Sequence, residues 1–185
     1  MAIRAAVVGT GFIGPVHVEA LQRIDVEVIG LCGSRPERAE TKARRLGIPR
    51  VYQTYEELLA DPSVDVVHIA TPNAYHYPQA RAALLAGKHV VCEKPLAMNA
   101  RESAELVEIA ERSGLIHAVC YNIRFYPMVQ HARALIRGGR IGGYSSHPRL
   151  ISPGLAPVGD RLELATDPRD GRRDPGRRRY WLSLD

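Results

Sequence analysis

Residues 7–14 read Val-Val-Gly-Thr-Gly-Phe-Ile-Gly, with glycine at positions 9, 11 and 14. This G-x-G-x-x-G spacing is typical of a turn that binds a dinucleotide, although three glycines in eight residues also recur by chance. The flanking sequence strengthens the interpretation, because the apolar run at residues 3–8 predicts a buried parallel strand leading into the turn. A helix is expected to follow, with one apolar face made of Ile13, Val16, Ala20, Leu21 and Ile24.

Each glycine of this stretch has a separate role if a dinucleotide binds. Gly9 makes the tight turn, Gly11 lets the backbone approach a pyrophosphate, and Gly14 lets the helix pack closely on the strand. The start of the helix offers unpaired N–H groups and a positive dipole end to the phosphates. The residues between the glycines, Thr10, Phe12 and Ile13, are therefore candidate cofactor contacts. A glycine-rich turn without a ligand is the alternative.

The same alternation of strand and helix continues along the chain. Apolar runs predict further strands at residues 26–32, 51–53, 64–70, 89–92 and 115–120. Amphipathic patterns predict helices at residues 36–46, 55–60, 75–86 and 100–113. Asn99, with Glu102 three residues later, is a predicted N-cap. We therefore expect an α/β fold, a Rossmann-type doubly wound parallel sheet, over a dinucleotide-binding domain of residues 1–121.

Composition limits the class of protein. The 185 residues, 45% of them hydrophobic, suit one domain or one domain and part of another. No stretch approaches a membrane span and no secretory leader is evident, so a cytoplasmic protein without membrane contact is expected. Cys32, Cys92 and Cys120 each end an apolar run and are expected to be small core residues. The histidines show no metal-ligand spacing, so the sequence predicts no metal site.

The character of the chain changes after residue 121. Residues 121–127 read as a link and residues 128–137 as one more amphipathic helix, so residues 122–143 suggest the start of a second domain. Residues 144–185 have no hydrophobic periodicity, five prolines and no lysine, and arginine is densest in this stretch of the chain. Composition alone predicts disorder there. A nucleic-acid-binding role of this arginine-rich tail is an alternative, although such tails bind phosphate without specificity.

Four segments at or beyond predicted strand ends suggest a family. The four strand-end segments are the glycine turn, residues 32–35, Thr71-Pro72-Asn73 with His76, and Glu93-Lys94-Pro95; the segment that begins with Asn122 lies beyond the last strand and adds to them. Together they resemble the Gfo/Idh/MocA oxidoreductases over residues 1–143, and Glu93-Lys94-Pro95 is the most specific mark. The resemblance implies a Rossmann domain followed by an α/β substrate domain. It also implies hydride transfer between NAD(P) and a sugar, polyol or related alcohol.

The resemblance assigns roles to residues of this chain. Lys94 becomes the candidate catalytic residue, near the nicotinamide ribose and the substrate hydroxyl; the alternative is a surface lysine in a loop. Pro95 is expected to fix its turn, and family members often have a cis bond there. His76 either faces the cofactor or packs on the loop. The candidate cofactor contacts outside the glycine turn are Ser34, Arg35, Arg38, Thr71, Pro72, Asn73, His76, Glu93, Lys94, Pro95 and Asn122.

The end of the second predicted strand bears on the choice of cofactor. NAD sites usually carry Asp or Glu there to bind the ribose 2′-hydroxyl, whereas this chain has Cys-Gly-Ser-Arg at residues 32–35. Ser34 and Arg35 can bind a 2′-phosphate, and Arg38 and Lys42 add positive charge. The sequence thus favours NADP over NAD. The alternative is that these cations only cover a solvated helix face.

The family's Asp-x-Gly-x-His motif, which supplies an acid/base histidine from the second domain, is missing from this chain. We expect the chain to bind a dinucleotide and to lack the catalytic half, with an inactive or regulatory binding module as the alternative. A sugar or polyol substrate, and a homo-oligomer, are expected only for a form with the second domain restored. Some codon choices for residues 179–184 encode Asp-Ile-Gly-Ser-His when they are read one base later. This string has the Asp-x-Gly-x-His pattern that the family carries, so the sequence suggests that residues 144–185 are translated out of frame.

Overall fold

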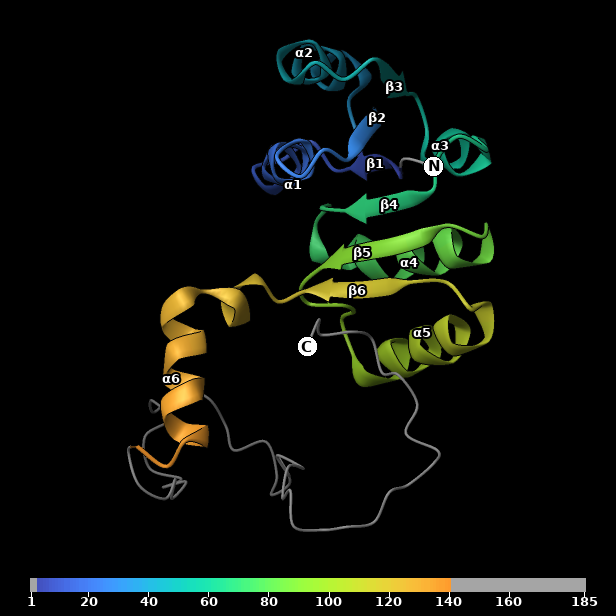
Figure 1. Cartoon of the computed structure of the whole chain (residues 1–185). Helices are drawn as coiled ribbons and strands as arrows, with labels where there is room; N and C mark the ends of the chain where they lie inside the picture. The colour runs from blue at the N-terminus through green and yellow to red at the C-terminus, as the bar shows by residue number, and fades with distance from the viewer. Residues whose placement is uncertain (1–2, 141–185) are drawn as a thin grey trace, which may run out of the picture. The chain divides into compact units, whose positions relative to one another are not determined.

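The computed structural model describes residues 3–140, and strands and helices alternate through them (Figure 1). The strands are β1 (Arg4–Val8), β2 (Glu27–Cys32), β3 (Arg50–Tyr52), β4 (Val66–Ile69), β5 (His89–Glu93) and β6 (His117–Cys120). The α-helices are α1 (Ile13–Gln22), α2 (Pro36–Leu46), α3 (Tyr55–Ala60), α4 (His76–Leu85), α5 (Ala100–Ser113) and α6 (Pro127–Arg137). Two 3₁₀ helices, η1 (Asn73–Tyr75) and η2 (Asn122–Phe125), complete the described elements.

The six strands form one parallel sheet in the order β3-β2-β1-β4-β5-β6. Strand order reverses on the two sides of β1, so β1 and β4 flank the switch point of a doubly wound sheet. All neighbouring strands pair in parallel, and the arrows of β1, β4, β5 and β6 in Figure 1 point the same way. The carboxyl ends of the strands therefore meet at one edge. This arrangement confirms the predicted Rossmann-type fold.

Each face of the sheet has its own apolar core. On one face, β1 and β2 pack against α1 and α2 through residues such as Val18, Leu21 and Ala43. On the other face, the sheet packs against α3, α4 and α5, with Leu58 and Leu106 fully buried. Burial of this kind stabilises the fold by roughly 1.5–3 kcal/mol for each large aliphatic side chain.

The inner face of α1 differs from the expected one. Its buried residues are Gly14, His17, Val18 and Leu21, whereas Ile13, Val16 and Ile24 are exposed. The rotation of the helix is set by Gly14, because a Cβ atom at this position would overlap the carbonyl oxygen of Gly9. Of the residues predicted to form the buried face of α1, only Leu21 is buried, and the rest of the prediction was wrong. The close packing of the Gly14 and Gly9 backbones decides which face of the helix turns inward.

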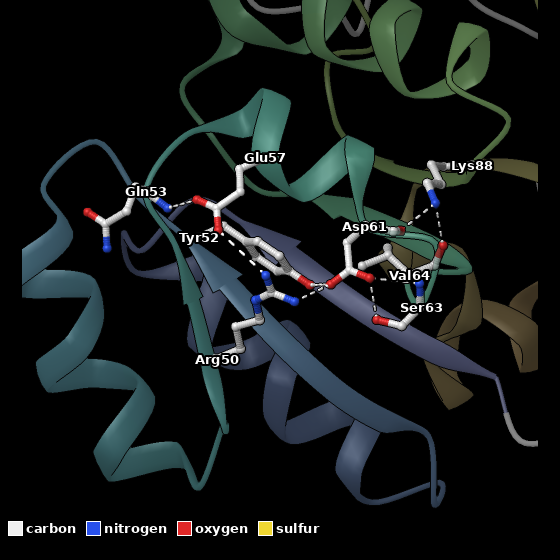
Figure 2. Close-up of polar contacts among 8 residues, drawn as sticks. All are labelled: Arg50, Tyr52, Gln53, Glu57, Asp61, Ser63, Val64 and Lys88. Atoms are coloured by element: carbon white, nitrogen blue, oxygen red, sulfur yellow. Dashed lines mark hydrogen bonds and ion pairs between the residues drawn. The ribbon is translucent and has the colours of Figure 1, made fainter.

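The turn after α3 is fixed by a polar network around Asp61 (Figure 2). Its carboxylate accepts hydrogen bonds from the Tyr52 hydroxyl at 2.7 Å and from the Ser63 hydroxyl at 2.6 Å, and it pairs with Arg50. The buried Lys88 ammonium donates to the carbonyl oxygens of Asp61 and Val64. These contacts hold the amino end of β4 in place, because they satisfy side chains and backbone carbonyls at the same turn.

Helix ends follow the local signals in the sequence. The Asn99 side chain accepts a hydrogen bond from the backbone N–H of Glu102 at 3.0 Å, as predicted, and Thr54 caps α3 in the same way. Gly47 and Gly114 end α2 and α5 with positive φ angles of 68° and 67°. No helix of the described part is long and apolar enough to cross a membrane.

Residues 122–140 belong to a second compact unit, distinct from the sheet domain. The stretch expected to be a simple link contains the 3₁₀ helix η2, and α6 follows with Pro127 in its first turn. The predicted aberrant tail at residues 144–185 lies outside the described residues.

Candidate functional site

A cleft of about 850 Å³ opens at the carboxyl ends of β1, β2, β3 and β4. The cleft lies at the switch point of the sheet, and doubly wound sheets bind their ligands at this point. The cleft is lined by the glycine turn, by the segments that follow β2 and β3, and by the segment that follows β4. Four strand ends thus contribute to one site.

The three glycines of the turn have different surroundings. Gly9 has a positive φ of 106°, and a Cβ atom there would overlap the carbonyl oxygen of Ala70 on β4's carboxyl side. A Cβ atom at Gly14 would overlap Gly9 itself, whereas one at Gly11 would have no atom within 4 Å. Gly9 and Gly14 thus permit close packing inside the protein, while Gly11 leaves room for a ligand on the cleft side.

Positive charge dominates the cleft. Arg35, Arg38 and Lys42 line it, and none of the lining residues in the described part of the chain is acidic. Arg35 is exposed at the N-cap position of α2, so its guanidinium is free to reach a ligand at the rim. Such a surface attracts phosphate groups rather than cations.

Lys42 has a second role in the cleft. Its ammonium donates hydrogen bonds to the backbone carbonyl oxygens of Thr10 and Gly11. This contact joins α2 to the glycine turn and occupies two of the three donors of the lysine. Arg35 and Arg38 are therefore the cations with guanidinium groups available for a ligand.

The cleft is also lined by residues that the sequence analysis did not identify. Gln53, Thr54 and Tyr55 follow β3, and Tyr75 and Gln79 follow β4; all five line the cleft. The Thr71 hydroxyl donates to the side chain of Gln79 at 2.6 Å, and the Tyr55 hydroxyl donates to its backbone carbonyl at 2.8 Å. Gln53, Thr54 and Tyr55 could have been predicted from their position after β3, because the carboxyl ends of parallel strands meet at one edge of the sheet.

His76 lies behind the cleft wall. The residue is 1% exposed, and its ring has Nδ1 2.6 Å from the carbonyl oxygen of Pro95 and Nε2 2.8 Å from that of Thr71. Of the two roles considered for it, this geometry matches packing on the loop.

The Glu93-Lys94-Pro95 segment follows β5, and its Lys94–Pro95 bond is cis. The Lys94 side chain is exposed, and its backbone N–H donates to Glu93 Oε2 at 3.2 Å. The other carboxylate oxygen of Glu93 lies 3.3 Å from Nε2 of His17 on α1. The turn that bears Lys94 is therefore connected to the helix that follows the glycine turn.

His17 also contacts a second histidine. Its Nδ1 lies 3.0 Å from Nδ1 of His68 on β4, and the two rings meet edge to face. Burial, with a smaller contribution from His17, lowers the pKa of His68 to about 3. His68 is therefore neutral at physiological pH.

Cys32 and Cys92 are buried as predicted, whereas Cys120 is half-buried.

The structure gathers only part of the predicted set in the cleft. The predicted residues that line it are Gly9, Thr10, Gly11, Phe12, Ile13, Ser34, Arg35, Arg38, Thr71 and Pro72. Those placed elsewhere in the sheet domain are Gly14, Asn73, His76, Glu93, Lys94 and Pro95. Asn122 begins η2 in the second unit.

Comparison with known proteins identifies relatives of this site. A family model described as an oxidoreductase family with an NAD-binding Rossmann fold, Gfo/Idh/MocA, matches residues 3–121. Trans-1,2-dihydrobenzene-1,2-diol dehydrogenase of Mus musculus is 35% identical over 145 residues, which are 77% of this chain and 44% of the mouse protein. D-xylose 1-dehydrogenase (NADP(+)) 2 of Haloferax volcanii is 38% identical over 70% of this chain and 40% of its own length.

A solved structure is similar over the same region. Levoglucosan dehydrogenase in complex with NADH and levoglucosan superposes with a TM-score of 0.72 and 33% identity, covering 77% of this chain and 41% of its own. The chain therefore spans about 40% of the length of the relatives that it matches.

Proposed function

The chain belongs to the Gfo/Idh/MocA oxidoreductase family, whose NAD-binding Rossmann fold covers residues 3–121, and we propose that its cleft binds NADP(H) in preference to NAD(H). The complete protein then transfers a hydride between this cofactor and a sugar, polyol or diol. The substrate class is suggested by relatives whose names specify D-xylose and dihydrobenzene-diol as substrates.

The observation that supports NADP is the charge of the cleft. Three cations and no acid line it in the described part of the chain, and Ser34 and Arg35 follow β2, where an NAD site usually has a carboxylate. A 2′-phosphate carries up to two negative charges, so guanidinium groups stabilise it strongly. A carboxylate at this position would repel it. The relative from Haloferax volcanii has NADP in its name, which agrees with the proposal.

We propose a role for each part of this site. The open space beside Gly11 receives the pyrophosphate, and Arg35 and Arg38 bind the phosphate on the adenine ribose. The nicotinamide cofactor, when bound, supplies or accepts the hydride. Lys94 is proposed as the catalytic residue because the family resemblance of its Glu93-Lys94-Pro95 segment assigns it that role. An ammonium group placed beside the reacting carbon would polarise a hydroxyl or carbonyl group.

The domain limits are part of the proposal. Residues 1–121 form the dinucleotide-binding domain, residues 122–143 begin the substrate domain, and residues 144–185 are read from another frame. The 185-residue chain then binds the dinucleotide without turning over substrate, because the acid/base histidine of the second domain is missing from it. The nucleotide sequence tests the frame: a stop codon in the +1 frame across codons 148–185 contradicts this part.

The central experiment compares cofactor affinities of the purified chain. Isothermal titration calorimetry with NADP⁺ and NAD⁺ at the same ionic strength is expected to give tighter binding of NADP⁺. A steep loss of NADP⁺ affinity with added salt is also expected, since surface charge pairs are screened. Equal affinities for the two cofactors contradict the preference, and no binding of either contradicts the assignment of the cleft.

A further inference from the structure

Three metal-binding side chains converge beside Lys94, outside the cofactor cleft. The register of the sheet pairs Glu93 at the end of β5 with Cys120 at the end of β6. Residues paired in this way point to the same side of a sheet, because side chains alternate along a strand. Cys92, the preceding residue of β5, is fully buried in the core on the opposite side, against α4 and α5. Glu93 and Cys120 therefore point to the side on which α1 lies.

His17 reaches the same point from α1. Its Nε2 is 3.3 Å from a carboxylate oxygen of Glu93, and ligand atoms of His17, Glu93 and Cys120 all lie within 4.8 Å of one another. Neighbouring ligands around a tetrahedral zinc ion are roughly 3.3–3.8 Å apart, given bond lengths of about 2.0–2.3 Å. The nitrogen and oxygen are at this spacing already. A rotamer adjustment of about 1 Å would bring the sulfur to it.

Two of the three donors, His17 and Glu93, also make outer contacts that orient them, as metal ligands usually do. His17 offers Nε2 to the cluster, while its Nδ1 contacts Nδ1 of His68 at 3.0 Å. With the shared proton on Nδ1 of His17, the lone pair of Nε2 is available for a metal. Glu93 accepts a hydrogen bond from the backbone N–H of Lys94 through its other oxygen. Such outer contacts orient ligands and raise metal affinity.

We propose that His17, Glu93 and Cys120 form a binding site for a divalent transition metal ion of the zinc class. Imidazole, carboxylate and thiolate are the three protein ligand types that zinc uses, and three of them with a water make an open tetrahedral site. The soft thiolate and the imidazole select against Mg²⁺ and Ca²⁺, which prefer oxygen ligands. On binding, the Cys120 thiol loses its proton to solvent, so the cation is balanced by thiolate and carboxylate.

The bound ion ties three separate elements together. Its ligands come from α1, the end of β5 and the end of β6, and Glu93 immediately precedes Lys94. The expected consequence is a higher stability of the sheet domain at a metal concentration above the dissociation constant. No spacing in the sequence indicates this site, because its ligands are 76 residues or more from His17 along the chain.

Cobalt(II) provides the test, since it replaces zinc and is coloured. Titration of Co²⁺ into the untagged chain is expected to produce a thiolate-to-cobalt charge-transfer band and intense d–d bands typical of tetrahedral coordination. Added Zn²⁺ removes both. Cys120→Ser is expected to abolish the charge-transfer band, while the matched control Cys32→Ala keeps it, because Cys32 lies on β2. Substitution of the supporting residue, His68→Phe, is expected to lower Co²⁺ affinity about 10–100-fold.

The outcomes are distinct from those of the cofactor experiment. No charge-transfer band with Co²⁺ in the millimolar range overturns the site, as does a band that survives Cys120→Ser. A band that disappears equally in Glu93→Gln and His17→Gln supports the full ligand set. NADP⁺ affinity is measured on the same samples, so loss of metal binding with intact cofactor binding separates this proposal from the proposed function.

Discussion

Nδ1 of His76 lies 2.6 Å from the carbonyl oxygen of Pro95, and this contact joins the loops that follow β4 and β5. The other ring nitrogen faces the carbonyl oxygen of Thr71 at 2.8 Å. A carbonyl group thus faces each nitrogen, and whichever nitrogen carries the proton donates to one of the two loops. The wall of the cofactor cleft and the turn that bears Lys94 are therefore coupled through one buried ring.

The first prediction follows from that coupling. His76→Phe retains a ring of similar size but removes the imidazole N–H, so the carbonyl oxygen of Pro95 or of Thr71 loses its hydrogen bond and the two loops lose their connection. The free energy of unfolding is expected to fall by about 1–3 kcal/mol, measured by urea denaturation. His131→Phe serves as control, because His131 is exposed on α6. An unchanged urea midpoint in His76→Phe contradicts the structural role.

The second prediction concerns acid stability. Hydrogen bonds from Ser63, through its hydroxyl and backbone N–H, and from Tyr52 lower the pKa of Asp61 from 3.8 to about 2, against the effect of partial burial (Figure 2). A carboxyl group whose pKa is lowered on folding adds stability above its unfolded pKa. That stability is lost as the pH falls from about 4 towards 2.

Asp61→Asn removes this pH dependence. At pH 7 the variant is expected to be less stable by about 1–3 kcal/mol, the range for hydrogen bonds to a charged group, and the difference narrows towards pH 2. Unfolding curves at several pH values measure it. Glu40→Gln, on the exposed side of α2, provides the control. A constant difference across this pH range would show that Asp61 does not titrate as described.

Much of this fold could be predicted from the sequence, because its signals are local. Helix α2, α3 and α5 have the predicted bounds to within a residue, since Pro36, Thr54 and Asn99 mark their first turns and a glycine or turn follows. The parallel sheet follows from strict alternation of apolar runs and helices. The glycine turn and the segments after β2 and β4 were identified for the cleft because each directly follows a strong strand.

The rest depended on contacts between distant residues. The buried face of α1 is set by the approach of Gly14 to Gly9, which outweighs the apolar side chains at Val16 and Ile24. Gln53 and Thr54 line the cleft through the placement of β3 at the sheet edge. No periodicity in the sequence records such placements, since they arise from the order in which the strands pair.

The third prediction separates two glycines of one motif. Gly14→Ala places a Cβ atom against the carbonyl oxygen of Gly9, so the variant is expected to lose stability by more than the ~1 kcal/mol that alanine gains in a helix. Gly11→Ala meets no protein atom within 4 Å, so its thermal midpoint stays close to that of the original chain. Its cofactor affinity is nevertheless expected to fall at least tenfold, because the methyl group occupies the ligand's space. Equal behaviour of the two variants in both assays contradicts this division.

The fourth prediction addresses Lys42, which bonds the backbone of the glycine turn. Lys42→Met keeps most of the aliphatic stem and removes the ammonium group, so the turn loses its connection to α2. NADP⁺ and NAD⁺ affinities are both expected to fall, and by similar factors, because both cofactors present the same pyrophosphate to this turn. A selective loss of NADP⁺ binding would instead assign Lys42 to the 2′-phosphate.

The last prediction tests the charge at the end of β2. Arg35 lines the cleft and is exposed at the N-cap of α2, so it can pair with a 2′-phosphate through two N–H groups. Arg35→Ala is expected to weaken NADP⁺ binding by about 1–3 kcal/mol, the range for a charge-assisted contact, and to leave NAD⁺ binding within error. Arg45→Ala is the matched control, since Arg45 is exposed in the last turn of the same helix and outside the cleft. The difference between the two cofactors isolates the 2′-phosphate, because every other group is common to both. If Arg35→Ala weakens both cofactors equally, or neither, the preference must come from another part of the cleft, and Arg38→Ala then becomes the deciding variant.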